Sequence, residues 1–229
     1  MMKALYTMIK IATACIALGI FGCATQSQPE QKETDIRVDH LPYYNEASFT
    51  PNWFDSAEYI PGNFHRIPAF NLYNQFGENI TEQSVSGKIM VVDFFFTSCP
   101  GICPKMTANL ALVQEAFLRD DKIRLLSHSV TPEFDNVEIL KEYADKKGVI
   151  GKKWHLLTGD RDHIYDLGRN QYFIEEDQGL NKDPEDFIHT ENFVLVDENR
   201  YIRGIYNGLN KTSVSQLIAD IKALKKASS

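Results

Sequence analysis

The sequence predicts an α/β fold in which a central mixed sheet is flanked by helices on both faces. Short apolar runs rich in β-branched and aromatic residues alternate along the chain with segments whose apolar residues recur at helical spacing. Strands separated by helices favour a mainly parallel arrangement, because each helix returns the chain to the same end of the sheet. The two last strands follow each other directly, so we expect an antiparallel hairpin at one edge.

The predicted elements begin near residue 70, after a segment over 41–70 that is rich in aromatic residues and prolines and is expected to be extended. Residues 70–83 predict an N-terminal β-hairpin whose turn is signalled by Asn79 after Gly77, and residues 88–97 predict a strand buried on both faces. Then follow a helix over 101–120, a strand over 122–131, a helix over 135–148, a strand over 153–159, a helix over 161–171, strands over 191–200 and 201–208, and a helix over 213–226. This order is typical of a thioredoxin-like fold.

The first residues, "MMKALYTMIKIATACIALGIFGC", resemble an export signal. Lys3 and Lys10 precede an apolar run that ends in small residues. A helix that spans a membrane needs about 20 apolar residues, so a retained anchor is the less favoured alternative. The stretch "IFGC" resembles a bacterial lipoprotein box, which implies cleavage before Cys23 and lipidation of Cys23. An ordinary signal peptide with an incidental cysteine is the other alternative.

The expected organisation is a signal peptide over 1–22, a flexible polar tether over 23–44 and one domain over 45–229. A lipid on Cys23 would hold an exported domain at the cell membrane of a bacterium, facing the periplasm or the outer side. The net charge of −7 and the lack of a basic cluster exclude nucleic acid binding. We expect a monomer.

Two cysteines, Cys99 and Cys103, remain in the predicted domain. A disulfide that closes so short a loop stabilises a fold little, which disfavours a purely structural role. Proline after Cys99 disfavours helical geometry there, whereas Pro104 suits the first turn of a helix. We therefore expect Cys99 in the loop and Cys103 in the first helical turn. Because helix N-termini stabilise thiolates, the pair suits either disulfide exchange or the binding of a soft metal.

A metal held by two thiolates needs a further donor, and histidine is the best candidate. His189 lies just before a predicted strand and after an acidic segment, and imidazole with two thiolates suits copper. His128 lies near the carboxyl end of a central strand, where sites of α/β sheets gather. The other histidines are expected at the surface or in the core: His40, His65, His155 and His163.

The phrases "VVDFFFTSCPGICPKM" and "FIHTENFVLVD" closely resemble the Sco/SenC family, and the similarity covers most of residues 65–225. The resemblance implies a copper site, for Cu(I) or Cu(II), formed by Cys99, Cys103 and His189. It also implies delivery of copper to the copper centre of cytochrome c oxidase, or thiol reduction that prepares that centre. The implied partner is the copper-bearing subunit of that oxidase or another exported copper protein.

The chain departs from the family pattern at two positions. Ile188 precedes His189, and Thr131 precedes a proline, where family members often have aspartate. Asp135 or Asp186 are candidates to supply the missing carboxylate near the ligands.

Two other functions remain open at this point. A thiol–disulfide oxidoreductase of exported proteins would use Cys99 and Cys103 as catalytic residues and would not need His189. A peroxide-reducing enzyme would need threonine and arginine beside its cysteine, and only Thr97 is near in sequence. The acidic residues 175–187 could dock a cationic partner, although such runs are more often solvated loops.

Overall fold

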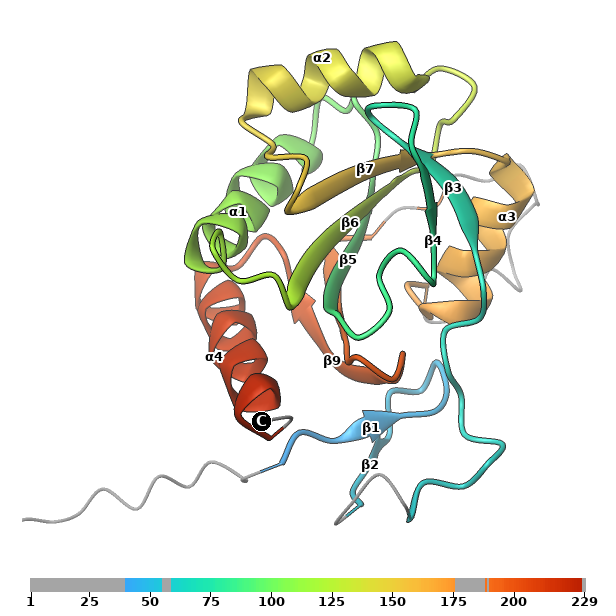
Figure 1. Ribbon diagram of the computed structural model, residues 1–229, viewed down its shortest axis with the longest axis vertical. Helices are drawn as coiled ribbons and strands as arrows, with labels where there is room; N and C mark the ends of the chain where they lie inside the picture. Colours follow the sequence, from blue (N-terminus) through green and yellow to red (C-terminus); the bar gives the residue numbers. More distant parts are fainter. Residues whose placement is uncertain (1–39, 55–58, 176–187, 189, 228–229) are drawn as a thin grey trace, which may run out of the picture. The chain divides into compact units, whose positions relative to one another are not determined.

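The computed structural model describes residues 40–54, 59–175, 188 and 190–227. Its strands are β1 (Tyr43–Tyr44), β2 (Pro51–Asn52), β3 (Asn71–Asn74), β4 (Asn79–Thr81), β5 (Ile89–Phe95), β6 (Ile123–Ser129), β7 (Trp154–Thr158), β8 (Asn192–Val196) and β9 (Ile202–Asn207). Its helices are α1 (Cys103–Ala116), α2 (Val137–Lys147), α3 (Arg161–Asp166) and α4 (Lys211–Ala227), and the π-helical turn η2 (Leu167–Gln171) continues α3 (Figure 1). Every strand and helix predicted from residue 70 onward is present.

The described strands form one mixed sheet in the order β2-β1-β9-β8-β5-β6-β7-β3-β4. The strands β5, β6 and β7 run parallel, and the other described pairs are antiparallel. The mixed α/β class is therefore confirmed, whereas the expectation of mainly parallel strands is wrong. The hairpin β8–β9 also lies inside the sheet and not at its edge, because β1 pairs with the outer side of β9.

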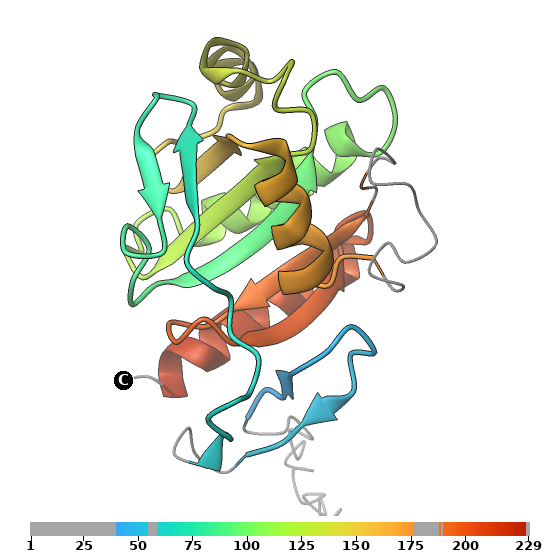
Figure 2. The same cartoon turned by 90° about the vertical axis from the view of Figure 1, so that its right-hand side faces the viewer.

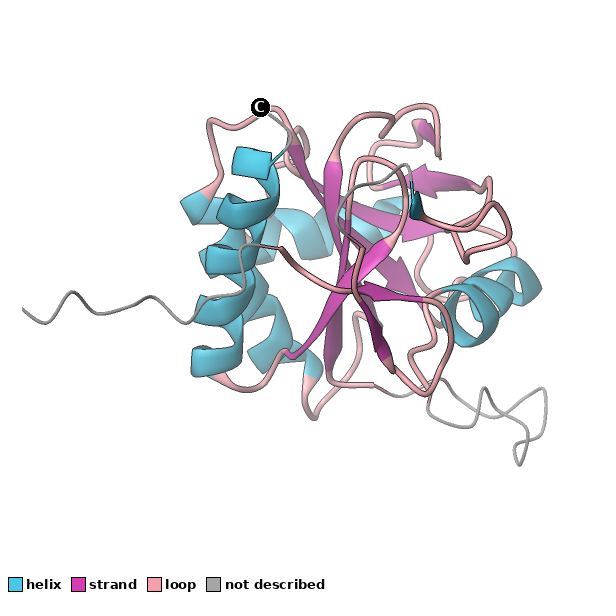
Figure 3. Cartoon of the chain, turned by 90° about the horizontal axis from the view of Figure 1, so that it is seen from below, coloured by secondary structure: helices cyan, strands magenta, loops and turns pink. Residues whose placement is uncertain are grey.

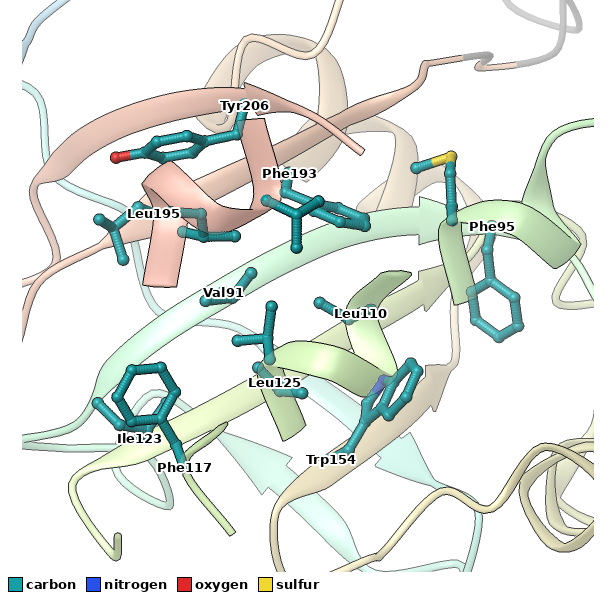
Figure 4. Close-up of a cluster of buried hydrophobic side chains, with 14 of the residues drawn as sticks. Val91, Phe95, Leu110, Phe117, Ile123, Leu125, Trp154, Phe193, Leu195 and Tyr206 are labelled. Carbon is teal, nitrogen blue, oxygen red and sulfur yellow. The ribbon is translucent and has the colours of Figure 1, made fainter. Parts of the chain in front are cut away.

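Helices cover both faces of this sheet (Figure 3). Side chains from α1, α2 and α4 share one core with the sheet, while side chains from α3 and η2 share a second core on the opposite face. Figure 2 shows α3 lying across that second face. Figure 4 shows part of the first core, in which side chains of α1 and of the strands pack together: Val91, Phe95, Leu110, Phe117, Ile123, Leu125, Trp154, Phe193, Leu195 and Tyr206.

Strand β5 lies at the centre of this arrangement, between β6 and β8. All of its seven residues are buried. Because side chains alternate along a strand, Val91 and Phe95 face the first core and Val92 and Phe94 face the second. A continuous apolar run is what such a position requires, and this explains why the sequence shows no alternation between apolar and polar residues here.

Both ends of α2 follow ordinary capping rules. The side chain of Asn136 accepts the N–H of Ile139 at the start of α2, and Gly148 ends the helix with φ of +70°. Gly148, the last residue of the predicted helix, is thus its C-terminal cap. None of the helices in the described residues has the length and apolar character needed to cross a membrane.

The residues before β3 are fastened to the sheet by Arg203 of β9. Its guanidinium forms an ion pair with Asp197 at 3.0 Å and donates hydrogen bonds to the carbonyl oxygens of Leu41 and Pro42. It also lies 3.6 Å from the ring centroid of Tyr43. The aromatic segment that the sequence predicted only as extended thus supplies β1 as a further strand beside β9.

Candidate functional site

The dithiol lies in the connection between β5 and α1 and at the first residue of α1. Cys99 is in the loop after β5, and Cys103 is the first residue of α1, as the prolines predict. Both are free thiols, and both are buried, with 9% and 5% of their surface exposed. They belong to the first core.

The N-terminus of α1 has an unusual cap. Ile102 occupies the N-cap position and offers no side-chain acceptor. Instead, the backbone N–H groups of Gly101, Ile102 and Cys103 donate to the sulfur of Cys99. A sulfur therefore accepts hydrogen bonds from N–H groups that would otherwise lack partners at the start of a helix.

The two thiols differ in their tendency to ionise. Burial raises the pKa of Cys99, but the hydrogen bonds from the Cys103 thiol and from the backbone amides outweigh burial, so its pKa lies below the ordinary value. For Cys103, burial, the hydrogen bond to Cys99 and the nearby negative charges raise the pKa to about 12. Cys99 is therefore the thiol that loses its proton first and the better nucleophile at neutral pH.

A buried acid lies on the same face of the sheet as the dithiol. Asp93 of β5 accepts a short hydrogen bond from the hydroxyl of Ser127, and Ser127 in turn accepts the indole N–H of Trp154 at 2.8 Å. Burial raises the pKa of Asp93 to about 7, although the bond from Ser127 opposes this shift. Its charge contributes to the raised pKa of Cys103, so the acid and the thiol are electrostatically coupled.

Comparison with known proteins agrees with this geometry. The family model described as SCO1/SenC matches residues 61–226, which is most of the chain. The chain belongs to the SCO1/SenC family. The match confirms the resemblance seen in the sequence.

Three solved Sco structures are similar to this chain. A SCO1/SenC family lipoprotein from Bacillus anthracis str. Ames is 29% identical, with a TM-score of 0.61 over 70% of this chain and 95% of that chain. BsSco, a member of the Sco family of cytochrome c oxidase assembly proteins with a disulfide switch, is 30% identical, with a TM-score of 0.60 over 71% and 94%. ScoI from Bradyrhizobium japonicum, solved with copper bound, is 25% identical, with a TM-score of 0.53 over 69% and 98%.

His189, implied by the Sco resemblance, and Cys23, implied by the lipoprotein box, lie outside the described residues. The neighbours of His189 are described: Ile188 and Thr190 are buried. Because β8 runs antiparallel to β5, with Val92 opposite Val194, the chain enters β8 at the end of the sheet where β5 ends. Within the described residues, no three His, Cys, Asp or Glu side chains come together as a metal site.

The structure removes His128 from the list of candidate ligands. Its ring stacks on Phe94, with 4.9 Å between centroids, and lies 5.7 Å from the ring of Tyr172. Both aromatic residues belong to the second core, across the sheet from the dithiol. Burial lowers the pKa of His128 to about 4, so it is a neutral core residue.

Sequence reasoning missed Asp93, and one signal could have found it. A single carboxylate interrupts the otherwise apolar run of β5. Charged side chains are almost never fully buried without a partner, so an acid in a strand that is buried on both faces indicates either a polar network or a shifted pKa.

We predict that Asp93→Asn changes how stability depends on pH. In the native protein Asp93 keeps its proton up to about pH 7, whereas its ordinary value is 3.8. The native state therefore binds a proton that the unfolded chain lacks between these values, and this group's contribution to stability is lost as pH rises toward 7. The full shift in the pKa of Asp93 corresponds to a contribution of at most about 4 kcal/mol to the free energy of unfolding.

Urea unfolding of both proteins between pH 4 and 8 tests this. The free energy of unfolding of Asp93→Asn, minus that of the wild type, should rise from pH 4 to 7 and then level off. Asp145→Asn, which removes an exposed carboxylate, is the control for the change in charge. A constant difference between Asp93→Asn and wild type across this range would contradict the prediction.

Proposed function

We propose that this protein is a membrane-tethered copper-binding protein that serves the assembly of the copper centre of cytochrome c oxidase. It binds copper through Cys99, Cys103 and His189, and acts as a metallochaperone, a thiol reductant, or both. The observation that carries the proposal is the pair of free, buried thiols at the start of α1, in a chain that matches the family over residues 61–226. A relative solved with copper bound supports the choice of metal.

The described donors suit copper by their chemistry. Thiolate ligands select soft ions such as Cu(I), and an added imidazole suits both oxidation states. The hydrogen bonds to Cys99 favour the thiolate form that a metal requires. Bound copper would supply the cargo for the client. The chain's own residues supply two sulfurs held at the end of a helix and, from His189, the third donor.

The second candidate function is thiol–disulfide exchange with exported proteins, and the unequal thiols favour it. The Cys99 thiolate would attack a client disulfide, form a mixed disulfide and release one client thiolate. Cys103, after losing its proton, would then attack the sulfur of Cys99, form the internal disulfide and release the second client thiol. The client is reduced by two electrons and the protein is oxidised by two.

We predict that Cys23→Ser releases the protein from membranes. The proposal places a lipid on Cys23, and the similar Bacillus anthracis structure is that of a lipoprotein. Without the acceptor thiol, the protein should appear in the soluble exported fraction after cell fractionation. Cys15→Ser, which alters the predicted signal peptide only, is the matched control. Continued membrane attachment of Cys23→Ser would indicate a retained helical anchor instead.

We predict that copper loading requires both domain thiols in the reduced form. A disulfide between Cys99 and Cys103 occupies both sulfurs that would otherwise coordinate the ion. Titration of copper into the reduced and the oxidised protein should show tight binding only for the reduced form. Equal affinity of the two forms would remove the dithiol from the metal site.

We predict that His189→Ala separates the two candidate functions. Cu(II) prefers nitrogen donors and a fuller shell, so its affinity should fall by more than the roughly 10- to 100-fold typical of an altered outer-shell partner, with a changed spectrum. Cu(I) tolerates two sulfurs and should lose less. Disulfide exchange depends on thiol ionisation and should persist.

Copper titration and an exchange assay on the same preparation check this, with His40→Ala as the matched control for loss of an imidazole. Unaltered binding and an unaltered spectrum of Cu(II) in His189→Ala would exclude His189 as a ligand. In that case, the oxidoreductase function would be the better account of the dithiol.

A further inference from the structure

The loop that carries Cys99 is attached to the rest of the fold by one buried carboxylate, that of Asp135. This residue follows β6 and is only 1% exposed. Its Oδ1 accepts the hydroxyl of Thr97 at 2.5 Å, and its Oδ2 accepts the N–H of Thr97 at 3.1 Å. Oδ2 also accepts the hydroxyls of Ser129 at 2.6 Å and Thr131 at 3.1 Å.

These contacts connect the carboxyl ends of two neighbouring parallel strands. Ser129 is the last residue of β6 and lies opposite Phe95, the last residue of β5. Thr97 comes two residues after β5 and two before Cys99. The four donors are three hydroxyls and one amide, so the carboxylate is satisfied by hydrogen bonds, and such bonds to a charged acceptor are strong.

Between Thr97 and α1, the chain is held by bonds that involve the sulfurs. The N–H of Phe96 donates to the sulfur of Cys103, and the N–H of Cys99 donates to the carbonyl of Phe96 at 3.3 Å. The sulfur of Cys99 accepts hydrogen bonds from the backbone amides at the start of α1. The loop is thus fixed at one end by α1 and at the other by the bonds of Thr97 to Asp135.

We propose that Asp135 is a positioning residue for the dithiol: by holding Thr97, it keeps Cys99 where the amides of the α1 N-terminus reach its sulfur. The inference deepens the proposed function, since it concerns the same dithiol in either metal binding or exchange. Asp135 acts through Thr97 and touches neither sulfur in the contacts described above.

The reduction potential of the dithiol reports this role directly. The amide hydrogen bonds stabilise the thiolate and hence the reduced form. When Cys99 is less well placed, the reduced form loses this stabilisation, and the equilibrium with glutathione shifts toward the disulfide. Each dithiol formed converts two glutathione thiols to one glutathione disulfide, so the reduced fraction at known glutathione ratios gives the potential.

The decisive variant is Thr97→Val, measured without copper. It removes one bond to Asp135, leaves every charge in place and should shift the equilibrium toward the disulfide. Asp135→Asn should shift it in the same direction by about tenfold, or about 30 mV for this two-electron couple. The double variant should shift the equilibrium no further than Asp135→Asn alone, because both substitutions break the same link between Thr97 and Asp135. Thr97→Ser, which keeps the hydroxyl, should match the wild type.

Asp197→Asn is the control for loss of a buried carboxylate. Asp197 follows β8, whose last residue Val196 lies opposite Met90, at the far end of β5 from the dithiol. This variant should lower stability and leave the potential unchanged. If Asp135→Asn does not fold, Thr97→Val decides alone.

Two outcomes would overturn the inference. An unchanged potential in Thr97→Val would show that the link to Asp135 does not position Cys99. A shift of Asp135→Asn toward the reduced form would show that Asp135 acts through its charge and not through Thr97. Because no copper is present, neither outcome bears on whether the wild-type protein binds copper, and failure of that binding would leave this test intact.

Discussion

The hydrogen bonds between one sulfur and the start of α1 are the interaction on which the site depends. A helix begins with N–H groups that need acceptors, and most helices take a side-chain oxygen for this purpose. Here Cys99 supplies the acceptor from outside the helix, and the bond both caps α1 and favours the thiolate. The geometry of the loop and the reactivity of the thiol are therefore set by the same contacts.

The rest of the fold holds α1 and the loop at fixed positions relative to each other. Strand β5, buried on both faces, fixes the start of the loop, and the first core fixes α1 against the sheet. The parallel partner β6 brings Asp135 to the end of the sheet where β5 finishes, and antiparallel β8 starts at that same end. Segments separated by many residues thus meet around one short loop.

Local chemistry made much of this predictable, and long-range contacts account for what was missed. The prolines beside Cys99 and Cys103 predicted correctly which cysteine is in the loop. Apolar periodicity predicted the central strands and helices. The periodicity of a strand does not reveal its direction. The sequence therefore did not predict that β8 runs antiparallel to β5, and the sheet has fewer parallel pairs than expected. Asp135 was a candidate carboxylate, but its contact with Thr97 joins residues 38 positions apart, which no local pattern reveals. His189 stays a prediction from the family resemblance.

The unequal thiols explain how one site can suit two chemistries. With its pKa raised to about 12, Cys103 keeps its proton at neutral pH, so the free pair carries at most one negative charge. Attack on a client disulfide needs only the Cys99 thiolate. A metal held by both sulfurs must also displace the proton of Cys103, which only an ion with high affinity for thiolates does. The dithiol is thus arranged for one-thiolate chemistry, and a bound soft cation would supply the free energy for the second deprotonation.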